Sequence, residues 1–249
     1  MKLGLSDRIA LITGGASGIG QSIAAALCAE GCEVFIADLD FSAADRAAQT
    51  IGAEAHALAI DVTDPADVER RIRDVAEATG RLDILVNSAG ILQIHSVIDA
   101  TIEDWQKICA VNLSGIYYCL KAALPFMLAQ KYGRIINIAS VSAIKGGGAF
   151  GNTLYGTTKA GVVAMSKGFA RELAPHGITV NAISPGVVDT AMTRSMLTPE
   201  LRERMLAAFP MQRFPSASEV ADLAVFIASD AAAAITGQNL IIDCGFLTK

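Results

Sequence analysis

The chain has 249 residues, of which 52% are hydrophobic and 18% are charged, and its formal net charge is -5. This acidic balance, without a long basic run, argues against a nucleic-acid partner, whose phosphates would need neutralising. Charged residues interrupt the apolar runs before they reach membrane-spanning length, and residues 1–8 lack the apolar core of a secretory signal. We therefore expect a cytoplasmic protein with no membrane partner.

The cysteines and histidines show no spacing that suits a metal site. The cysteines form an odd set scattered along apolar segments, namely Cys28, Cys32, Cys109, Cys119 and Cys244. We expect them to be buried free thiols, and we expect no metal cofactor.

Short β-branched runs alternate with longer helical patterns along almost the whole sequence. The predicted strands lie at 8–13, 33–37, 55–60, 83–87, 134–139, 178–183 and 239–243. The predicted helices lie at 18–30, 42–51, 65–79, 102–130, 154–175 and 218–228. Repeated strand–helix–strand units of this kind build a parallel sheet covered by helices. No linker or repeat divides the sequence, so we predict a single α/β domain that spans residues 1–249.

The first predicted strand runs directly into a glycine-rich turn at residues 14–20, which precedes a helix. Glycines allow a tight turn and let backbone N–H groups approach a pyrophosphate, which the helix N-terminus also attracts. An ordinary strand-to-helix turn favours glycine too, so this turn alone is weak evidence. Gln21 stands where a nucleotide-triphosphatase loop requires lysine, which argues against that class.

Asp38 ends the second predicted strand, about twenty residues beyond the glycine turn, where an acidic residue can bind an adenosine ribose. Its carboxylate would repel a 2′-phosphate. No lysine or arginine within residues 15–17 or at Leu39 could neutralise such a phosphate. The sequence therefore favours NAD over NADP.

Two polar clusters follow predicted strands, at residues 61–62 and 87–90. The carboxyl ends of parallel strands line the ligand crevice of an open sheet, although the same residue types also dominate ordinary turns. The methionine-rich segment 190–215, punctuated by prolines, is predicted to form an excursion that covers this site.

Tyr155 and Lys159 stand four residues apart at the start of a predicted helix and therefore share one face. A phenol with a pKa of about 10 is a poor base at neutral pH, but a nearby ammonium lowers that value. Ser140 and Ser142 follow the strand at 134–139, so their hydroxyls are expected at the same edge of the sheet.

These motifs together resemble the short-chain dehydrogenase/reductase family across nearly the whole chain. Residues 13–20 match its TGxxxGxG turn, residues 87–90 resemble its NNAG motif, and residues 155–159 match its YxxxK motif. The resemblance implies a Rossmann-like, doubly wound, seven-stranded parallel sheet in a three-layer α/β/α domain. It also implies a catalytic group made of Asn112, Ser140, Tyr155 and Lys159. The predicted cofactor-binding residues are Gly14, Ser17, Gly18, Ile19, Asp38, Asp61, Val62, Asn87, Ala89, Gly90, Tyr155, Lys159, Pro185, Gly186, Val188 and Thr190.

The sequence departs from the family pattern at three places. Ser88 replaces a second asparagine, and Cys244 replaces a glycine near the C-terminus. Ser140 lies fifteen positions before Tyr155, whereas Ser142 lies at the more familiar thirteen. We prefer Ser140 because it directly follows the strand, and Ser142 remains the alternative.

The resemblance implies a hydride transfer between NAD and a secondary alcohol or ketone, such as a polyol or a cyclic alcohol. Tyr155 would act as general acid/base and Ser140 would polarise the substrate oxygen. Lys159 would lower the pKa of Tyr155 and bind the nicotinamide ribose, while Asn112 would position a water molecule. The alternatives are an NADP-linked 3-oxoacyl thioester reductase and a non-catalytic dinucleotide-binding regulator.

The choice of substrate depends on the side chains that form the walls of the pocket. Candidates for lining that pocket are His95, Lys145, Phe150, Asn152, Met192, Met196 and Phe209. The apolar helices at 102–130 and 154–175 correspond to the family's subunit interface and predict a homotetramer, with a homodimer as the alternative.

Overall fold

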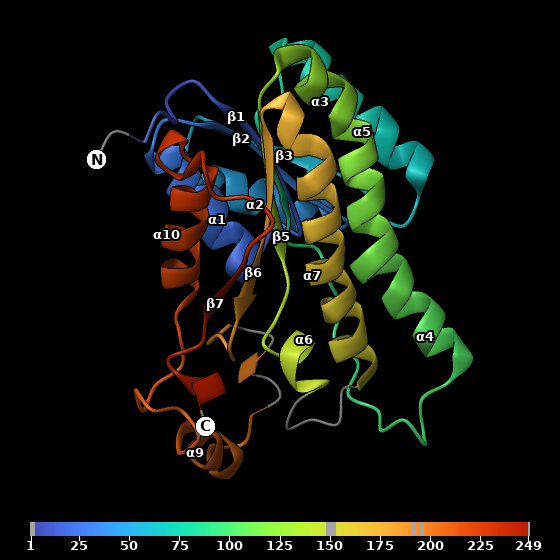
Figure 1. The fold of residues 1–249 in the computed structure, drawn as a ribbon, viewed down its shortest axis with the longest axis vertical. Coiled ribbons are helices and arrows are strands. Elements are labelled where there is room, and N and C mark those ends of the chain that lie inside the picture. The colour runs from blue at the N-terminus through green and yellow to red at the C-terminus, as the bar shows by residue number, and fades with distance from the viewer. Residues whose placement is uncertain (1–2, 148–152, 191–192, 195–196, 249) are drawn as a thin grey trace.

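The computed structural model describes residues 3–147, 153–190, 193–194 and 197–248. Its strands form one seven-stranded parallel sheet in the order β3-β2-β1-β4-β5-β6-β7 (Figure 1). The strands are β1 Ile9–Thr13, β2 Glu33–Asp38, β3 Ala55–Ala59, β4 Ile84–Asn87, β5 Gly133–Ile138, β6 Ile178–Pro185 and β7 Asn239–Ile242. The predicted fold class is confirmed.

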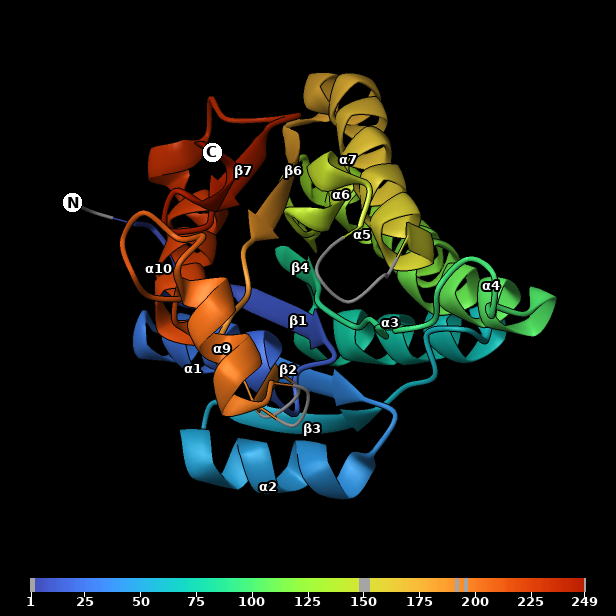
Figure 2. The same cartoon turned by 90° about the horizontal axis from the view of Figure 1, so that it is seen from below.

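Helices cover both faces of the sheet and make three layers (Figure 2). The α-helices are α1 Gly18–Ala29, α2 Phe41–Ile51, α3 Pro65–Thr79, α4 Ile102–Cys109, α5 Gly115–Gln130, α6 Ser142–Lys145, α7 Thr153–Leu173, α9 Pro199–Leu206 and α10 Ala217–Ala228. One apolar core lies between the sheet and α1, α2 and α10, and a second lies between the sheet and α3, α5 and α7. The sequence did not predict α6.

The central strands are buried along their whole length, because helices cover them from both sides. Every residue of β1, β4, β5 and β6 is buried. This explains why these strands are almost continuously apolar instead of alternating. The chain order reverses between β1 and β4, the place where open parallel sheets form their ligand crevice.

The predicted helix at 102–130 is one helical stretch that changes geometry midway. A π-helical segment, Ala110–Ser114, separates α4 from α5. The stretch is long and apolar enough to cross a membrane. Core helices of soluble proteins pass the same test, so its length and composition are weak evidence for a membrane span. Cys119 is buried as expected, and Leu120 is buried with it in the core between the sheet and α3, α5 and α7, so neither residue belongs to an exposed apolar face.

All five cysteines are free, but they are not all buried as expected. Cys32 and Cys119 are buried, whereas Cys28, Cys109 and Cys244 are half-buried. Burial raises the pKa of Cys119 to about 12. The three half-buried thiols lie at the surfaces of helices and a turn. The apolar residues around them in the sequence did not indicate this exposure.

The segment that follows β6 folds over the carboxyl edge of the sheet. Thr198 caps α9, and Pro199 occupies its first turn, where proline costs no backbone hydrogen bond. Met205, Phe209 and Phe214 form a small separate apolar cluster with residues near the C-terminus. Phe209 is fully buried in this cluster, so its predicted place on the pocket wall was wrong.

Candidate active site

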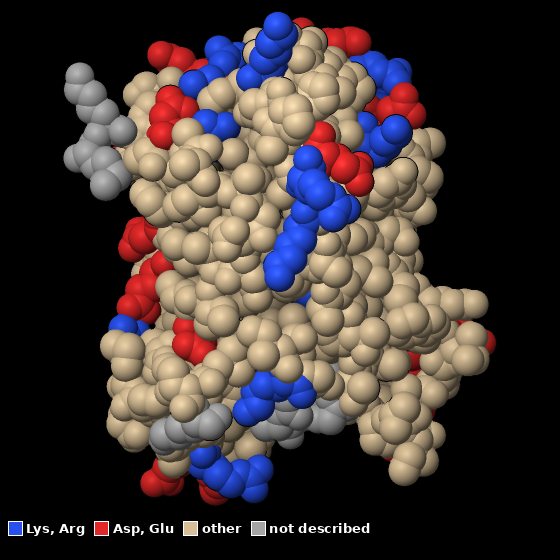
Figure 3. All heavy atoms as spheres, in the orientation of Figure 1, with Lys and Arg blue, Asp and Glu red and all other residues tan. Residues whose placement is uncertain are grey.

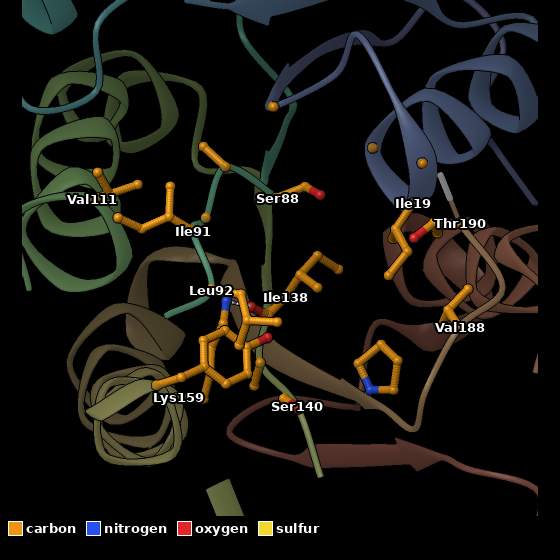
Figure 4. A pocket seen from close by; sticks show the side chains of 18 of the residues that line it. Ile19, Ser88, Ile91, Leu92, Val111, Ile138, Ser140, Lys159, Val188 and Thr190 are labelled. Carbon is orange, nitrogen blue, oxygen red and sulfur yellow. Dashed lines mark hydrogen bonds between the residues drawn. The ribbon is translucent and has the colours of Figure 1, made fainter. Parts of the chain in front are cut away.

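A cavity of about 780 Å³ opens at the carboxyl edge of the sheet. Figure 4 shows Ser140 and Lys159 on one side of it and Ile19, Val188 and Thr190 on the other. The predicted site residues that line it are Gly14, Ser17, Gly18, Ile19, Asp38, Asp61, Val62, Ala89, Gly90, Ser140, Tyr155, Lys159, Pro185, Gly186, Val188 and Thr190. Nearly the whole predicted set therefore converges on one cavity.

The glycine turn packs so closely on the loop after β4 that side chains would not fit. A Cβ atom on Gly14 would lie 2.7 Å from the Cα atom of Ala89, and one on Gly20 would lie 2.3 Å from the carbonyl oxygen of Gly14. At the start of α1, Ser17 makes no side-chain capping bond within the described structure. The first N–H groups of α1 thus remain able to bind an anion.

Asp38 is held against the glycine turn at the wall of the cavity. Its Oδ2 accepts a hydrogen bond from the backbone N–H of Ala16 at 3.2 Å, and its Oδ1 accepts one from Asp40 N–H at 3.2 Å. Asp61 is similarly fixed, because its Oδ1 accepts bonds from the N–H and the hydroxyl of Thr63 at 2.9 and 2.7 Å. Both carboxylates thus have defined positions.

Tyr155 from α7 and Ser140, which follows β5, line the same cavity, and the Ser140 side chain acts on the Tyr155 hydroxyl to lower its pKa. The Ser140 Oγ also accepts a bond from the backbone N–H of Ser142 at 3.1 Å. Ser142 lines the cavity too, but it is Ser140 whose side chain affects the pKa of Tyr155.

Lys159 lies buried beside this pair, with its Nζ 5.7 Å from the centre of the Tyr155 ring. The Nζ donates a hydrogen bond to the carbonyl oxygen of Ile138 at 2.7 Å. Burial lowers the pKa of Lys159 to about 8. Burial also raises the pKa of Tyr155, and only the bond to Ser140 opposes this rise. The expected lowering of the Tyr155 pKa by Lys159 is therefore not found, because desolvation dominates.

Asn112 lies in the π-helical segment and is fully buried behind the cavity wall. Its Nδ2 donates to the carbonyl oxygen of Ile91 at 3.0 Å and to the hydroxyl of Thr158 at 3.1 Å. Its Oδ1 accepts from the N–H of Ile91 at 2.9 Å. This side chain ties the loop after β4 to α7.

Asn87 is also buried behind the cavity instead of lining it. Its Nδ2 donates to Asn137 Oδ1 at 2.8 Å, and Asn137 in turn donates to Ser166 at 2.9 Å. This chain joins β4, β5 and α7. Spacing placed Asn87 at the correct strand end but could not reveal which way its side chain points.

Fewer of the residues that were predicted to line the substrate pocket are confirmed. Lys145 lines the cavity, but His95 is exposed outside it and contacts Asp104 at 3.3 Å. The candidates Phe150, Asn152, Met192 and Met196 lie outside the described residues. The sequence interpretation missed several apolar lining residues, namely Ile91, Leu92, Val111, Val141, Val187, Met205 and Phe246. The loops after the strands and the predicted excursion at 190–215 were the available signals for most of them.

Comparison with known proteins shows the family to which this chain belongs. A family model described as enoyl-(acyl carrier protein) reductase matches residues 14–247. The chain belongs to the short-chain dehydrogenase/reductase family. It is thus an oxidoreductase of that family, as its motifs predicted.

Two curated family relatives match almost the whole chain. The 3-oxoacyl-[acyl-carrier-protein] reductase FabG of Escherichia coli is 38% identical over 243 residues, which cover 98% of each chain. The uncharacterized oxidoreductase YxjF of Bacillus subtilis is 38% identical over 259 residues, covering 98% of this chain and 100% of the relative.

Two solved structures superpose over almost the whole chain. The crystal structure of gox2181 has a TM-score of 0.97 at 38% identity and covers 100% of this chain and 98% of its own. A putative short-chain alcohol dehydrogenase from Sinorhizobium meliloti has a TM-score of 0.93 at 38% identity, covering 99% and 98%.

Proposed function

We propose that this oxidoreductase transfers a hydride between NAD and a secondary alcohol or ketone, with Tyr155 as the general acid/base. The observation that carries the proposal is the meeting of Ser140, Tyr155 and Lys159 on one wall of the cavity. Fold alone would not support an activity, but these groups suit proton transfer to a substrate oxygen.

The residues present fit a dinucleotide cofactor. Gly14 and Gly18 keep the phosphate-facing turn free of side chains, and Asp38 presents a carboxylate with a fixed position to a ribose. When bound, the nicotinamide accepts a hydride from the substrate carbon or delivers one to it.

In the proposed reduction, the Tyr155 hydroxyl donates its proton to the substrate oxygen, and in oxidation it takes that proton back. The Ser140 hydroxyl holds the same oxygen. Lys159, with a pKa of about 8, can exchange a proton near neutral pH and replenish the phenol. Asn112 keeps Ile91 and α7 in place, and its predicted water-positioning role remains a prediction.

A second candidate, an NADP-linked 3-oxoacyl thioester reductase, is favoured by the names of the relatives at 38% identity. Asp38 opposes the NADP part of that candidate, because its charge would face the 2′-phosphate. Oxidation of NADH and of NADPH, measured with simple ketones and with a 3-oxoacyl thioester, separates the two. Binding of a dinucleotide without turnover would instead favour the regulator.

Replacing Asp38 tests the choice of cofactor. The ratio of kcat/KM with NADH to that with NADPH should fall by roughly 10- to 100-fold in Asp38→Ala, since a charged hydrogen-bonding group contributes about 1.5–3 kcal/mol. Asp38→Asn is the matched control, because it keeps an acceptor for Ala16 N–H but removes the charge. Equal efficiency with both cofactors in the unaltered protein would contradict the proposal.

The assembly that we propose is a homotetramer, with a homodimer as the alternative, and its interface includes the outer faces of α5 and α7. Tyr117 is 45% exposed and stacks on Phe169 at 6.5 Å, and Ala164 is exposed on α7. Figure 3 shows charged side chains over the upper part of α7 and an uncharged area beside and below them. Exposed apolar areas typically mark subunit contacts. A cytoplasmic location remains a prediction.

Ala164→Glu should split this assembly, because it would bury a charge where two helices meet. Light scattering at micromolar concentration should show a fall from tetramer or dimer toward monomer. Ala78→Glu, at an exposed position of α3, is the control and should leave the mass unchanged. A monomeric unaltered protein would refute the interface.

A further inference from the structure

The acidic and the basic side chains that line the cavity lie on different sides of it. The carboxylate of Asp38 ends β2 and that of Asp61 follows β3. The amines of Lys145 and Lys159 lie beside the end of β5, and Lys107 reaches the cavity from α4. In the sheet order β2 lies three strands from β5, which is about 14 Å at the usual strand spacing. The described lining beside Ser140 and Tyr155 therefore carries amines and no carboxylate.

Lys145 is the amine at this end that the proton-transfer chemistry does not use. It is the last residue of α6, which starts at Ser142, about one helical turn away. Its Nζ stands 4.1 Å from the centre of the Phe246 ring, and Phe246 stacks on the buried Phe209 at 4.7 Å. The aromatic contact thus holds the ammonium against the cavity wall.

Lys145 makes no ion pair within the described residues, unlike two arginines of the segment that covers the site. Arg194 pairs with Asp189 at 2.8 Å, and Arg213 pairs with Glu219 at 2.7 Å. The charge of Lys145 is therefore available to a ligand in the cavity.

Apolar side chains contribute much of the remaining cavity wall, namely Leu92, Val141, Val187, Met205 and Phe246. A ligand that fits has a short apolar body, a carbonyl or hydroxyl at Tyr155 and one anionic group at Lys145. The ammonium of Lys145 is a compact point charge, which can balance the single charge of a carboxylate. We propose that Lys145 is a specificity-determining residue and that the substrates are short oxo and hydroxy carboxylates.

This inference rests on the proposed hydride transfer and names its substrate class. In the reduction, the ketone carbon gains the hydride and its oxygen gains the proton of Tyr155, so NADH is oxidised and a hydroxy carboxylate forms. The carboxylate itself takes no part in the bond changes. It only binds the ammonium, and for this reason its loss should appear mainly in KM.

The test compares each acid with its neutral amide: acetoacetate with acetoacetamide, and levulinate with levulinamide. The quantity measured is the ratio of kcat/KM for acid to that for amide, which a general loss of activity does not alter. In Lys145→Met this ratio should fall roughly tenfold, mainly through a higher KM for the acid. Lys145→Arg keeps the charge and should retain most of the ratio.

An unchanged ratio in Lys145→Met, in a protein that still reduces the amides, would overturn the role of Lys145 and leave the proposed function standing. Failure of the unaltered protein to reduce any ketone with NADH or NADPH would overturn the proposed function itself. The two failures are therefore distinguishable.

Discussion

Tyr155→Phe is expected to lower turnover by roughly 10²–10⁴-fold, the usual contribution of a general acid/base. The change removes only the hydroxyl, and the ring keeps its place on α7. Affinity for NADH should therefore remain nearly unchanged. Steady-state turnover with a ketone and a fluorescence titration with NADH measure the two quantities separately.

Tyr132→Phe is the matched control for this variant. Its hydroxyl contacts Asp230 at 3.2 Å, away from the residues that line the cavity, so turnover should be preserved. If Tyr155→Phe kept near-normal turnover while a deuterium isotope effect showed that hydride transfer limits the rate, Tyr155 would not be the proton carrier.

Lys159→Met is expected to reduce turnover by about 10²-fold or more and to weaken NADH binding. It replaces a buried ammonium by an apolar side chain of similar length. Turnover with a ketone and a titration with NADH check both effects, and unchanged values of both would exclude Lys159 from the site.

The same variant also changes how stability depends on pH. The pKa of Lys159 in the folded protein, about 8, lies below the value of about 10.4 for an unfolded chain. Between these values the unfolded chain binds more protons, so the contribution of Lys159 to stability rises with pH. From pH 7 to pH 9 the unaltered protein should gain about 1 kcal/mol relative to Lys159→Met.

Comparing the two proteins isolates this contribution, because buried thiols such as Cys32 and Cys119 are common to both. Their raised pKa values lower stability as pH rises above 9 in each protein alike. Urea unfolding at several pH values measures the difference. A constant difference between pH 7 and pH 9 would contradict the lowered pKa of Lys159.

The sequence by itself determined the fold class and the edge of the sheet where the site lies. Apolar runs such as β1 and β5 are recognisable because central parallel strands are buried on both faces. The glycine turn at 14–20, Asp38 and the strand-end Ser140 were predictable because a parallel sheet brings all its carboxyl ends to one edge. Local spacing was enough for these features.

Only the tertiary structure decided where individual side chains point and what surrounds them. Asn87 and Asn112 turned out to be buried ties between elements, and Phe209 turned out to belong to a separate cluster, because side-chain direction depends on neighbours that are distant in the chain. The pKa values of Tyr155 and Lys159 are set by desolvation, which the packing of α7 against the sheet creates. Sequence spacing placed those two residues together, but burial is a property of the folded chain as a whole.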